Sequence, residues 1–342
     1  MDTIKVETLN VKNVPSIEGL VFRRYHGASD HPELIALHNA IYEHADIEER
    51  ETPDEFDLFF ANLRNCNPHE DMIIAEVEDK IIASGRVAWS EEFEGDYIYA
   101  VNNSIHPEWE DSGLPETIQH WLEKRARQIS TGHPQEAEKY FQSWTTETQK
   151  AKIAMLHTFG YEASRYFLEM FRDLSEPIPD GKLPPGLEVH PVKPEHYRPI
   201  WEGANEAFRD HWGHVEGTEE DYQRFLKRIE EVESYDPALW MVAWDGEEVA
   251  GMVLNKIIAE ENEALGIRRG WTDPICVRRQ WRRRGLATAL VYRSMQMLKD
   301  KGMDQAGLGV DTINPSGALK LYQNCGYRTA QKWITYRKRL NL

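Results

Sequence analysis

Cysteine is scarce in this chain: the three cysteines among 342 residues are Cys66, Cys276 and Cys325. They form no CxxC pair, and their number does not fit a framework of paired disulfides. The sequence therefore predicts neither a disulfide-stapled fold nor a zinc knuckle, and it suits a reducing compartment. We expect a cytoplasmic protein that holds no metal ion.

Long hydrophobic runs and an excess of positive charge are also missing. No apolar run approaches the roughly 20 residues that a membrane-spanning helix needs. Charged residues interrupt the first twenty positions, so we expect no signal peptide and no membrane helix. The chain has 40 Lys and Arg against 58 Asp and Glu, a net charge of −18. This balance argues against general affinity for nucleic acid or for an anionic membrane.

The chain does contain enough apolar side chains for packed cores. Hydrophobic residues make up 41% and aromatic residues 11% of it, which argues against disorder. Its length suggests two domains, and a run rich in proline and glycine at 175–186 is typical of a linker. The sequence therefore predicts domains at 1–175 and 187–342, joined by a linker at 176–186.

The two halves carry matching landmarks. Gly85 corresponds to Gly251, and Gly160 corresponds to Gly326, in each case at a separation of about 166 residues. Such a constant separation predicts a duplicated architecture. The hydrophobic patterns of both halves predict a mixture of strands and helices, among them strands at 97–105 and 271–277.

Positive charge gathers at one turn of the second half. After the expected strand at 271–277 come five arginines, then Gly285, then a helix with one apolar face; the arginines are Arg278, Arg279, Arg282, Arg283 and Arg284. A glycine turn that opens a helix leaves backbone N–H groups free at the positive end of the helix dipole. This pattern favours a pyrophosphate cradle. The alternatives are a solvated arginine face or a patch for nucleic acid.

Two motifs resemble those of the GNAT superfamily of acyl-CoA-dependent N-acyltransferases. Arg282-x-x-Gly285-x-Ala287 is similar to the superfamily's Arg/Gln-x-x-Gly-x-Gly/Ala loop, and the segment 314–327 is similar to its second landmark. The two-domain layout resembles mycothiol synthase and related bacterial tandem acetyltransferases. The resemblance implies an α/β (α+β) chain with two tandem GNAT folds, each a mixed, mostly antiparallel twisted sheet flanked by helices.

The first half departs from these motifs. Three carboxylates occupy the turn that matches the arginine turn, namely Glu108, Glu110 and Asp111. Pro115 stands where Ala287 stands in the second half and removes an N–H donor. Because carboxylates repel a pyrophosphate, we predict that the first domain has lost acetyl-CoA binding. It would then serve as a scaffold or as one wall of the acceptor cleft.

The resemblance assigns acetyl-CoA as acyl donor and places its binding residues in the second half. The turn would hold the diphosphate through Arg282, Arg283, Arg284, Gly285, Leu286, Ala287 and Thr288. The strand before it would hold the pantetheine arm through the amides of Ile275, Cys276 and Val277, and Asn314 would contact the same arm. Cys276 is alternatively a small buried side chain with no chemical role.

The same resemblance suggests two catalytic residues. Tyr322 would protonate the departing thiolate, unless it is only a core aromatic. Asp273 would act as general base, directly or through water, unless it only forms a turn before Pro274. Deprotonation by bulk solvent also remains open.

The acceptor pocket is expected near the end of the first helix of the second half, at Asp210, His211 and Trp212. A metal site at His211-x-x-His214 lacks a nearby third ligand. We expect an N-acetyltransferase for a small-molecule amine, as monomer or homodimer, with neither nucleic acid nor membrane as a partner. The alternatives are an acyl-CoA sensor without turnover and an acetyltransferase for basic peptides, protein lysines or N-termini.

Overall fold

The computed structural model describes residues 9, 11–92, 95–314 and 316–341. The chain forms two compact units: unit 1 is Met1–Arg165 with Trp333–Leu342, and unit 2 is Tyr166–Lys332. These boundaries differ from the expected ones. The chain passes between the units inside two long strands, β6 (Glu162–Asp173) and β13 (Arg328–Arg339), because one part of each strand pairs in unit 1 and the other part in unit 2.

The segment expected to be an interdomain linker belongs to unit 2. It is extended, as proline and glycine favour, but it packs along helix α9 (Leu286–Asp300). Arg293 donates a hydrogen bond from Nε to the Gly181 carbonyl at 2.7 Å. A Cβ at Gly181 would lie 2.7 Å from the Ala289 carbonyl oxygen, so only glycine allows this approach. We call residues 175–186 the strap.

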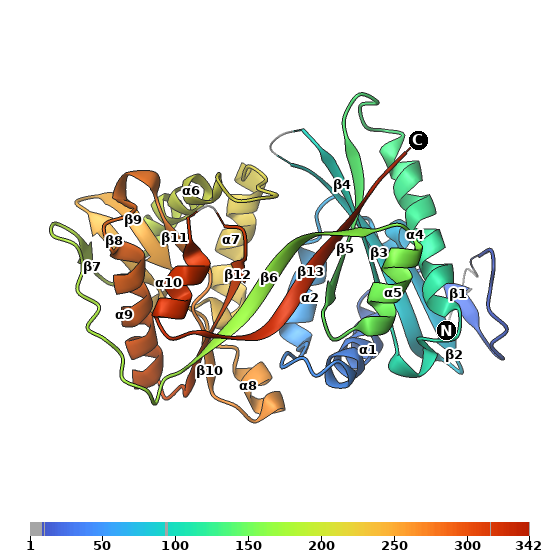
Figure 1. Ribbon diagram of the computed structural model, residues 1–342, viewed down its shortest axis with the longest axis horizontal. Coiled ribbons are helices and arrows are strands. Elements are labelled where there is room, and N and C mark those ends of the chain that lie inside the picture. Colours follow the sequence, from blue (N-terminus) through green and yellow to red (C-terminus); the bar gives the residue numbers. More distant parts are fainter. Residues whose placement is uncertain (1–8, 10, 93–94, 315, 342) are drawn as a thin grey trace. The chain divides into compact units, whose positions relative to one another are not determined.

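Unit 1 is a mostly antiparallel sheet in which only β4 and β5 run parallel (Figure 1). The order of hydrogen-bonded strands is β1-β2-β3-β4-β5-β13. Its other elements are β1 (Val21–Arg23), α1 (His31–His44), α2 (Pro53–Ala61), α3 (Pro68–Asp71), β2 (Met72–Val77), β3 (Lys80–Glu91), β4 (Tyr97–Ile105), α4 (Leu114–Ser130), β5 (Lys139–Thr146) and α5 (Lys150–Thr158). The predicted strand at 97–105 is confirmed by β4.

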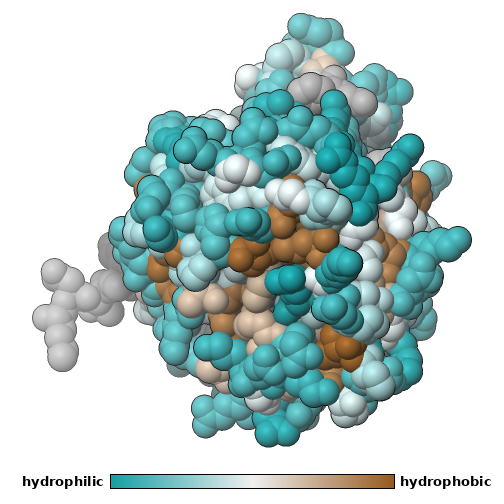
Figure 2. Space-filling view, turned by 90° about the vertical axis from the view of Figure 1, so that its left-hand side faces the viewer, coloured by the Kyte–Doolittle hydropathy of each residue, from teal (hydrophilic) through white to brown (hydrophobic). Residues whose placement is uncertain are grey.

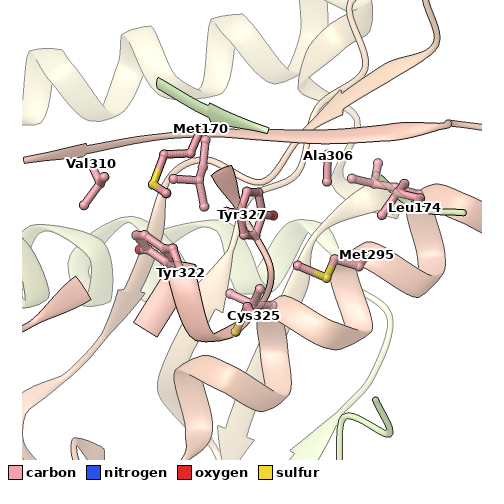
Figure 3. Close-up of a cluster of buried hydrophobic side chains, with 11 residues drawn as sticks. Met170, Leu174, Met295, Ala306, Val310, Tyr322, Cys325 and Tyr327 are labelled. Atoms are coloured by element: carbon pink, nitrogen blue, oxygen red, sulfur yellow. The ribbon is translucent and has the colours of Figure 1, made fainter. Parts of the chain in front are cut away.

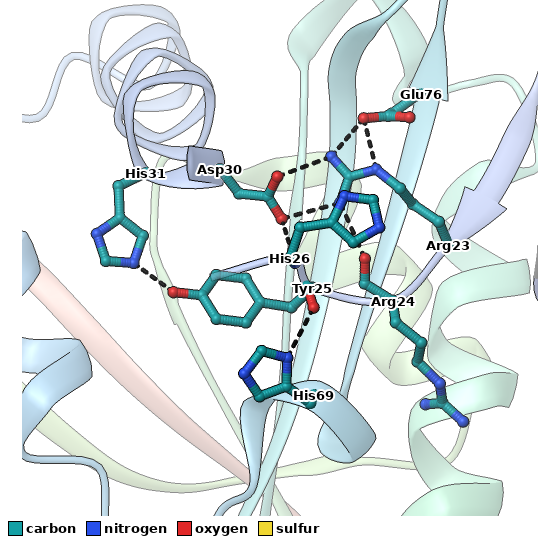
Figure 4. Close-up of polar contacts among 8 residues, drawn as sticks. All are labelled: Arg23, Arg24, Tyr25, His26, Asp30, His31, His69 and Glu76. Atoms are coloured by element: carbon teal, nitrogen blue, oxygen red, sulfur yellow. Dashed lines mark hydrogen bonds and ion pairs between the residues drawn. The ribbon is translucent and has the colours of Figure 1, made fainter. Parts of the chain in front are cut away.

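A polar network fastens the first strand of unit 1 to the first helix (Figure 4). Arg23 of β1 donates to Asp30 at 2.8 Å and, from Nε, to Glu76 of β2 at 2.7 Å. Beyond Arg23 the chain leaves the sheet, and Tyr25 contacts His31 at the start of α1. Burying this arginine is tolerable because two carboxylates satisfy its donors.

Unit 2 contains two groups of strands. One has the order β13-β6-β12-β10 and the other β11-β9-β8-β7. Its remaining elements are β7 (Glu188–Val189), α6 (Tyr197–Phe208), α7 (Glu219–Glu231), β8 (Met241–Asp245), β9 (Glu248–Val253), α8 (Ala259–Leu265), β10 (Arg269–Trp271), β11 (Ile275–Val277), α9, β12 (Gln305–Asp311) and α10 (Ala318–Asn324). Both units therefore carry the expected fold of a mixed sheet flanked by helices.

The strand expected at 271–277 is broken in the structure. It forms β10, which pairs with β12 in parallel, and β11, which pairs with β9 in the antiparallel sense. The break lies at Thr272–Pro274, where proline has no N–H to continue a ladder. The chain thus changes partner strands in front of the arginine turn.

Helix α9 has a buried apolar side and an outer side that carries Arg293. Its apolar side is buried against both groups of strands of unit 2 and includes Leu286, Leu290, Val291, Met295 and Leu298. The surface in Figure 2 is mainly hydrophilic, with hydrophobic residues gathered in a few areas. No helix of the described part of the chain is both long and apolar enough to cross a bilayer.

Candidate functional site

The arginine turn of unit 2 presents a run of free backbone amides. Gly285 has φ 83°, and α9 begins directly after it. The first amide of this segment that is bonded in the helical manner is that of Ala289, to the Gly285 carbonyl at 3.1 Å. Within the described part of the chain, the amides of residues 283–288 have no acceptor. They lie at the positive end of a 15-residue helix, which is a suitable place for a phosphate group.

The arginines of the turn divide into structural and exposed ones. Arg282 has a structural role, because its guanidinium group donates three hydrogen bonds within unit 2. The acceptors are the Asp210 carboxylate at 2.7 Å, the Ala207 carbonyl at 2.9 Å and the Val277 carbonyl at 2.9 Å. Arg283 and Arg284 are exposed and have no side-chain partner among the described residues. These two are therefore the ones whose charge is available to an anion.

Asp210, expected in the acceptor pocket, lies among these arginines instead. Its carboxylate accepts from Arg279 at 3.0 Å and from Arg282 at 2.7 Å. These hydrogen bonds hold the pKa of Asp210 far below its usual value. The residue ties the end of α6 to the turn, and its charge is already compensated.

Strands β11 and β12 diverge next to the turn. Thr272 donates its N–H to the Gly307 carbonyl at 2.8 Å, and no later backbone bond joins β11 to β12 within the described residues. On its other side β11 pairs with β9, with bonds from Leu254 N–H to the Pro274 carbonyl and from Arg278 N–H to the Ala250 carbonyl. The facing main-chain groups of β11 and β12 are therefore not bonded to each other among these residues, and we call this separation the opening.

Alternation along β11 decides which amides face this opening. Since residues 274 and 278 bond to β9, Cys276 does so too, and the N–H groups of Ile275 and Val277 point the other way. The structure therefore offers two of the three expected amides, not that of Cys276. Burial raises the pKa of the Cys276 thiol to about 12, which suits an inert buried side chain.

Gly309 is a site residue that sequence reasoning missed. It is exposed in β12, two residues beyond Gly307, with nothing within 4 Å of the position of a Cβ. Having the same backbone direction as Gly307, it faces the opening with unpaired main-chain groups. The available signal was the Gly-Leu-Gly run at 307–309, because glycine inside a strand often marks a close approach of another chain or ligand.

Tyr322 of α10 lies in the apolar cluster that supports this opening. Figure 3 shows its ring at one side of the cluster and the ring of Tyr327 nearer the middle, with centroids 6.1 Å apart. Tyr327 shares a hydrogen bond of 2.7 Å with Thr272, whereas the Tyr322 hydroxyl has no partner among the described residues. Burial, and next the nearby Asp273 carboxylate, raise the pKa of Tyr322 well above its usual value. The hydroxyl thus remains protonated and is unused by the fold.

Asp273 stands at the break between β10 and β11. It remains exposed to solvent, yet it lies among enough protein atoms that desolvation raises its pKa, against the opposing effect of Lys256. The Asp273 carboxylate also contributes to the raised pKa of Tyr322, so the two expected residues lie in the same part of unit 2.

Asn314 forms a local turn after β12. Its Oδ1 accepts from the Ser316 N–H at 2.9 Å and from the Ser316 hydroxyl at 2.6 Å. The motif's Pro315 lies outside the described residues. The side-chain oxygen of Asn314 is therefore engaged in the turn, which leaves only its amide nitrogen for a ligand.

The other two expected acceptor residues lie beyond the end of α6. His211 packs its ring against Phe208, at 4.6 Å between centroids. Burial lowers its pKa, and the nearby Asp311 at the end of β12 opposes that effect. The ring of Trp212 lies 6.4 Å from that of Phe167 in β6. Asp311 is the pairing partner of Phe167 between β12 and β6, so a carboxylate and aromatic residues occur together here, a combination that suits a cationic group.

No group of three or more His, Cys, Asp or Glu side chains with metal-binding geometry occurs in the described ranges. The groups at the diverging strands are backbone amides, a tyrosine hydroxyl and one carboxylate. They can hold an anionic ligand, donate a proton and accept one.

The sequence resembles known acetyltransferases over its second half. The model of the Acetyltransferase (GNAT) family matches residues 198–327, which include the turn, Asp273 and Tyr322. A protein named mycothiol acetyltransferase from Thermobispora bispora is 29% identical over 196 residues, covering 57% of this chain. The match spans 64% of that relative, just under two thirds of its length.

Solved structures resemble the fold over almost the whole chain. A GCN5-related N-acetyltransferase from Sphaerobacter thermophilus superposes with a TM-score of 0.72 at 22% identity, covering 95% of this chain and 98% of that one. A tandem GNAT protein from the clavulanic acid biosynthesis pathway gives a TM-score of 0.67 at 12% identity, covering 94% and 99%. Identities this low show the fold alone.

Proposed function

We propose that this chain, whose residues 198–327 match the model of the Acetyltransferase (GNAT) family, transfers an acetyl group from acetyl-CoA to the primary amine of a small molecule, in unit 2. The observation that carries this proposal is that six amides of the arginine turn have no acceptor among the described residues. In the same unit the Tyr322 hydroxyl, whose pKa the Asp273 carboxylate raises, has no partner among them either. Acetyl-CoA, when bound, supplies an activated thioester.

The residues of unit 2 fit such a donor. The amides of residues 283–288 and the side chains of Arg283 and Arg284 would hold its diphosphate. The amides of Ile275 and Val277, with the main chain of Gly309, would hold the extended arm that follows. The Val277 N–H is the group we assign to the carbonyl oxygen that gains charge during transfer.

Two side chains would move the protons of the reaction. Asp273 would accept a proton from the acceptor's ammonium group, directly or through water, so that the neutral amine can attack; its raised pKa makes it a stronger base than an ordinary carboxylate. Tyr322 would donate its hydroxyl proton to the departing sulfur, because its raised pKa keeps the hydroxyl protonated. The carboxylate and aromatic rings around His211 and Trp212 favour a cationic acceptor.

The experiment measures acetyl-CoA binding by calorimetry and thiol release with amines, aminoglycosides, amino acids and basic peptides. The variant Gly285→Asp places a carboxylate next to the free amides, where it would repel the diphosphate. We expect it to weaken acetyl-CoA binding tenfold or more. Gly246→Asp is the matched control, since Gly246 is also exposed, has φ 61° and lies in the β8–β9 turn. Normal binding by Gly285→Asp would contradict the cradle. Binding without thiol release for any acceptor would favour a sensor.

A further inference from the structure

Unit 1 contains a cavity at the place where unit 2 has its diverging strands and glycine turn. The cavity has a volume of about 460 Å³, within the range of small-molecule sites. It is lined by β4, β5, α1, α5, the turn before α4 and Trp333 of β13, all parts of unit 1. The fold has therefore kept a pocket in the copy whose cofactor motif is lost.

The turn that borders this cavity begins and ends like the arginine turn. A 3₁₀ turn ends at Trp109 in unit 1 and at Trp281 in unit 2. The glycine that follows has φ 81° and ψ −3° at Gly113, compared with φ 83° and ψ 2° at Gly285. The helix then begins at a buried leucine in both units. Between these points the backbones differ: Glu110 is helical at φ −60° and ψ −34°, whereas Arg282 is extended at φ −64° and ψ 158°. The side chains differ as well.

Those side chains invert the charge of the turn. Glu110 and Asp111 stand three and two residues before the glycine, where unit 2 has Arg282 and Arg283, and Glu116 stands three residues after it. All three line the cavity, and none has an ion-pair partner among the described residues. Burial raises the pKa of Glu110, with His44 opposing and Asp111 adding to that effect. A ligand with positive charge would relieve this crowding of carboxylates.

Several groups that would bind a CoA-type ligand are engaged or missing in unit 1. The Leu114 N–H donates to the Ser112 hydroxyl at 3.2 Å, and Pro115 has no N–H. Where β4 leaves β5, Asn102 Oδ1 accepts from the Trp144 N–H at 3.2 Å and Lys152 donates to the Asn103 carbonyl at 2.8 Å. Side chains thus occupy two main-chain groups of these diverging strands, the Trp144 N–H and the Asn103 carbonyl, which leaves fewer partners for an extended amide ligand.

The remaining lining suits an organic cation. Trp144, Trp333 and Tyr42 contribute aromatic surface, and Met155 contributes an apolar wall. Lys152 is the one ammonium group of the lining; it is directed to Asn103, and burial lowers its pKa to about 8. Aromatic rings with carboxylates on one side are the usual surroundings of an amine ligand.

We propose that the unit 1 cavity binds a small organic cation, an ammonium group on an apolar or aromatic body, with the ammonium held by Glu110, Asp111 and Glu116. The site is separate from the proposed transfer centre in unit 2 and does not depend on it. It arises from the cofactor cleft of the first copy by inversion of the charge at the turn.

The test uses the full chain with methyl-labelled methionine and no acetyl-CoA, so that Met155 reports on the cavity by NMR. Its signal is assigned with Met155→Leu. Tyramine is the probe, and 4-hydroxyphenylpropionate is the matched anion of similar shape. We expect tyramine to shift the Met155 signal saturably and the anion to leave it in place.

The variant Glu110→Gln/Asp111→Asn should weaken that binding at least tenfold without lowering Tm, because it removes unpaired like charges. Glu33→Gln/Glu136→Gln is the control, since it removes two charges from exposed positions outside the lining and should bind tyramine as the natural chain does. The proposal is overturned if coenzyme A or the anion shifts Met155, if tyramine does not, or if the two variants bind tyramine equally.

Discussion

Tyr322 and Tyr327 of unit 2 differ in the hydrogen bonding of their hydroxyl groups. Their phenylalanine variants should therefore separate an effect on catalysis from an effect on stability. In Tyr322→Phe we expect kcat to fall by about 100-fold, the lower end for loss of a positioned acid. Tm should hardly change, because the hydroxyl has no partner within the described residues. Steady-state kinetics and thermal melts measure both quantities.

Tyr327→Phe is the control for that prediction. Its hydroxyl bonds to Thr272 at 2.7 Å, so its loss should cost about 1 kcal/mol of stability with a smaller effect on kcat. Full kcat in Tyr322→Phe would remove this hydroxyl from the reaction and leave Tyr322 as a core aromatic.

The raised pKa of Asp273 predicts an acidic limb in the pH profile of the activity. Desolvation raises its folded-state pKa above the ordinary carboxyl value, and a base acts only when deprotonated. Activity should therefore be present above that raised pKa and be lost as the pH falls through it. Asp273→Asn should lower kcat/KM and abolish this limb. A variant profile with the same limb would assign the proton transfer to water or solvent. The tyrosine, with its raised pKa, should set no alkaline limb below the range of an ordinary tyrosine.

At the level of elements, the strap is part of the packing of unit 2. Gly181→Ala would place a Cβ 2.7 Å from the Ala289 carbonyl oxygen and 3.2 Å from the Arg293 amide, so strap and helix α9 must separate. We expect a loss of about 1–3 kcal/mol and a lower Tm. Gly132→Ala is the matched control, since its Cβ would meet the Ile129 carbonyl only at 3.5 Å. Equal melting of the two variants would mean that the strap is not packed in solution.

At the level of the whole molecule, the sequence-based boundary and the structural one predict different behaviour of a fragment. A fragment 187–342 lacks residues 167–173 of β6, which pair with all seven residues of β12, and it carries β13 without its partner β5. We expect this fragment to lack cooperative unfolding and to aggregate through the exposed strand edges. Circular dichroism melts and light scattering test this against the full chain. A soluble fragment that melts cooperatively would support the boundary at 176–186.

The local sequence was sufficient for most elements and for the turn. Periodicity indicated the strand at 97–105, which is β4, because the alternation of a strand is a property of residues near in sequence. The glycine spacing indicated the cradle at Gly285, because positive φ and a helix start are properties of a short segment. The same reasoning recognised the changed charge of the turn at Glu110 and Asp111.

Contacts between distant segments decided the rest. No local pattern shows that Asp210 would compensate Arg279 and Arg282, or that the last strand would return to unit 1. The cavity of unit 1 likewise exists only where helices, strands and Trp333 meet. By itself, the sequence determined the mixed fold and the glycine turn before α9, since these depend on short segments. The tertiary structure decided which charges and amides remain free, because their availability depends on partners far along the chain.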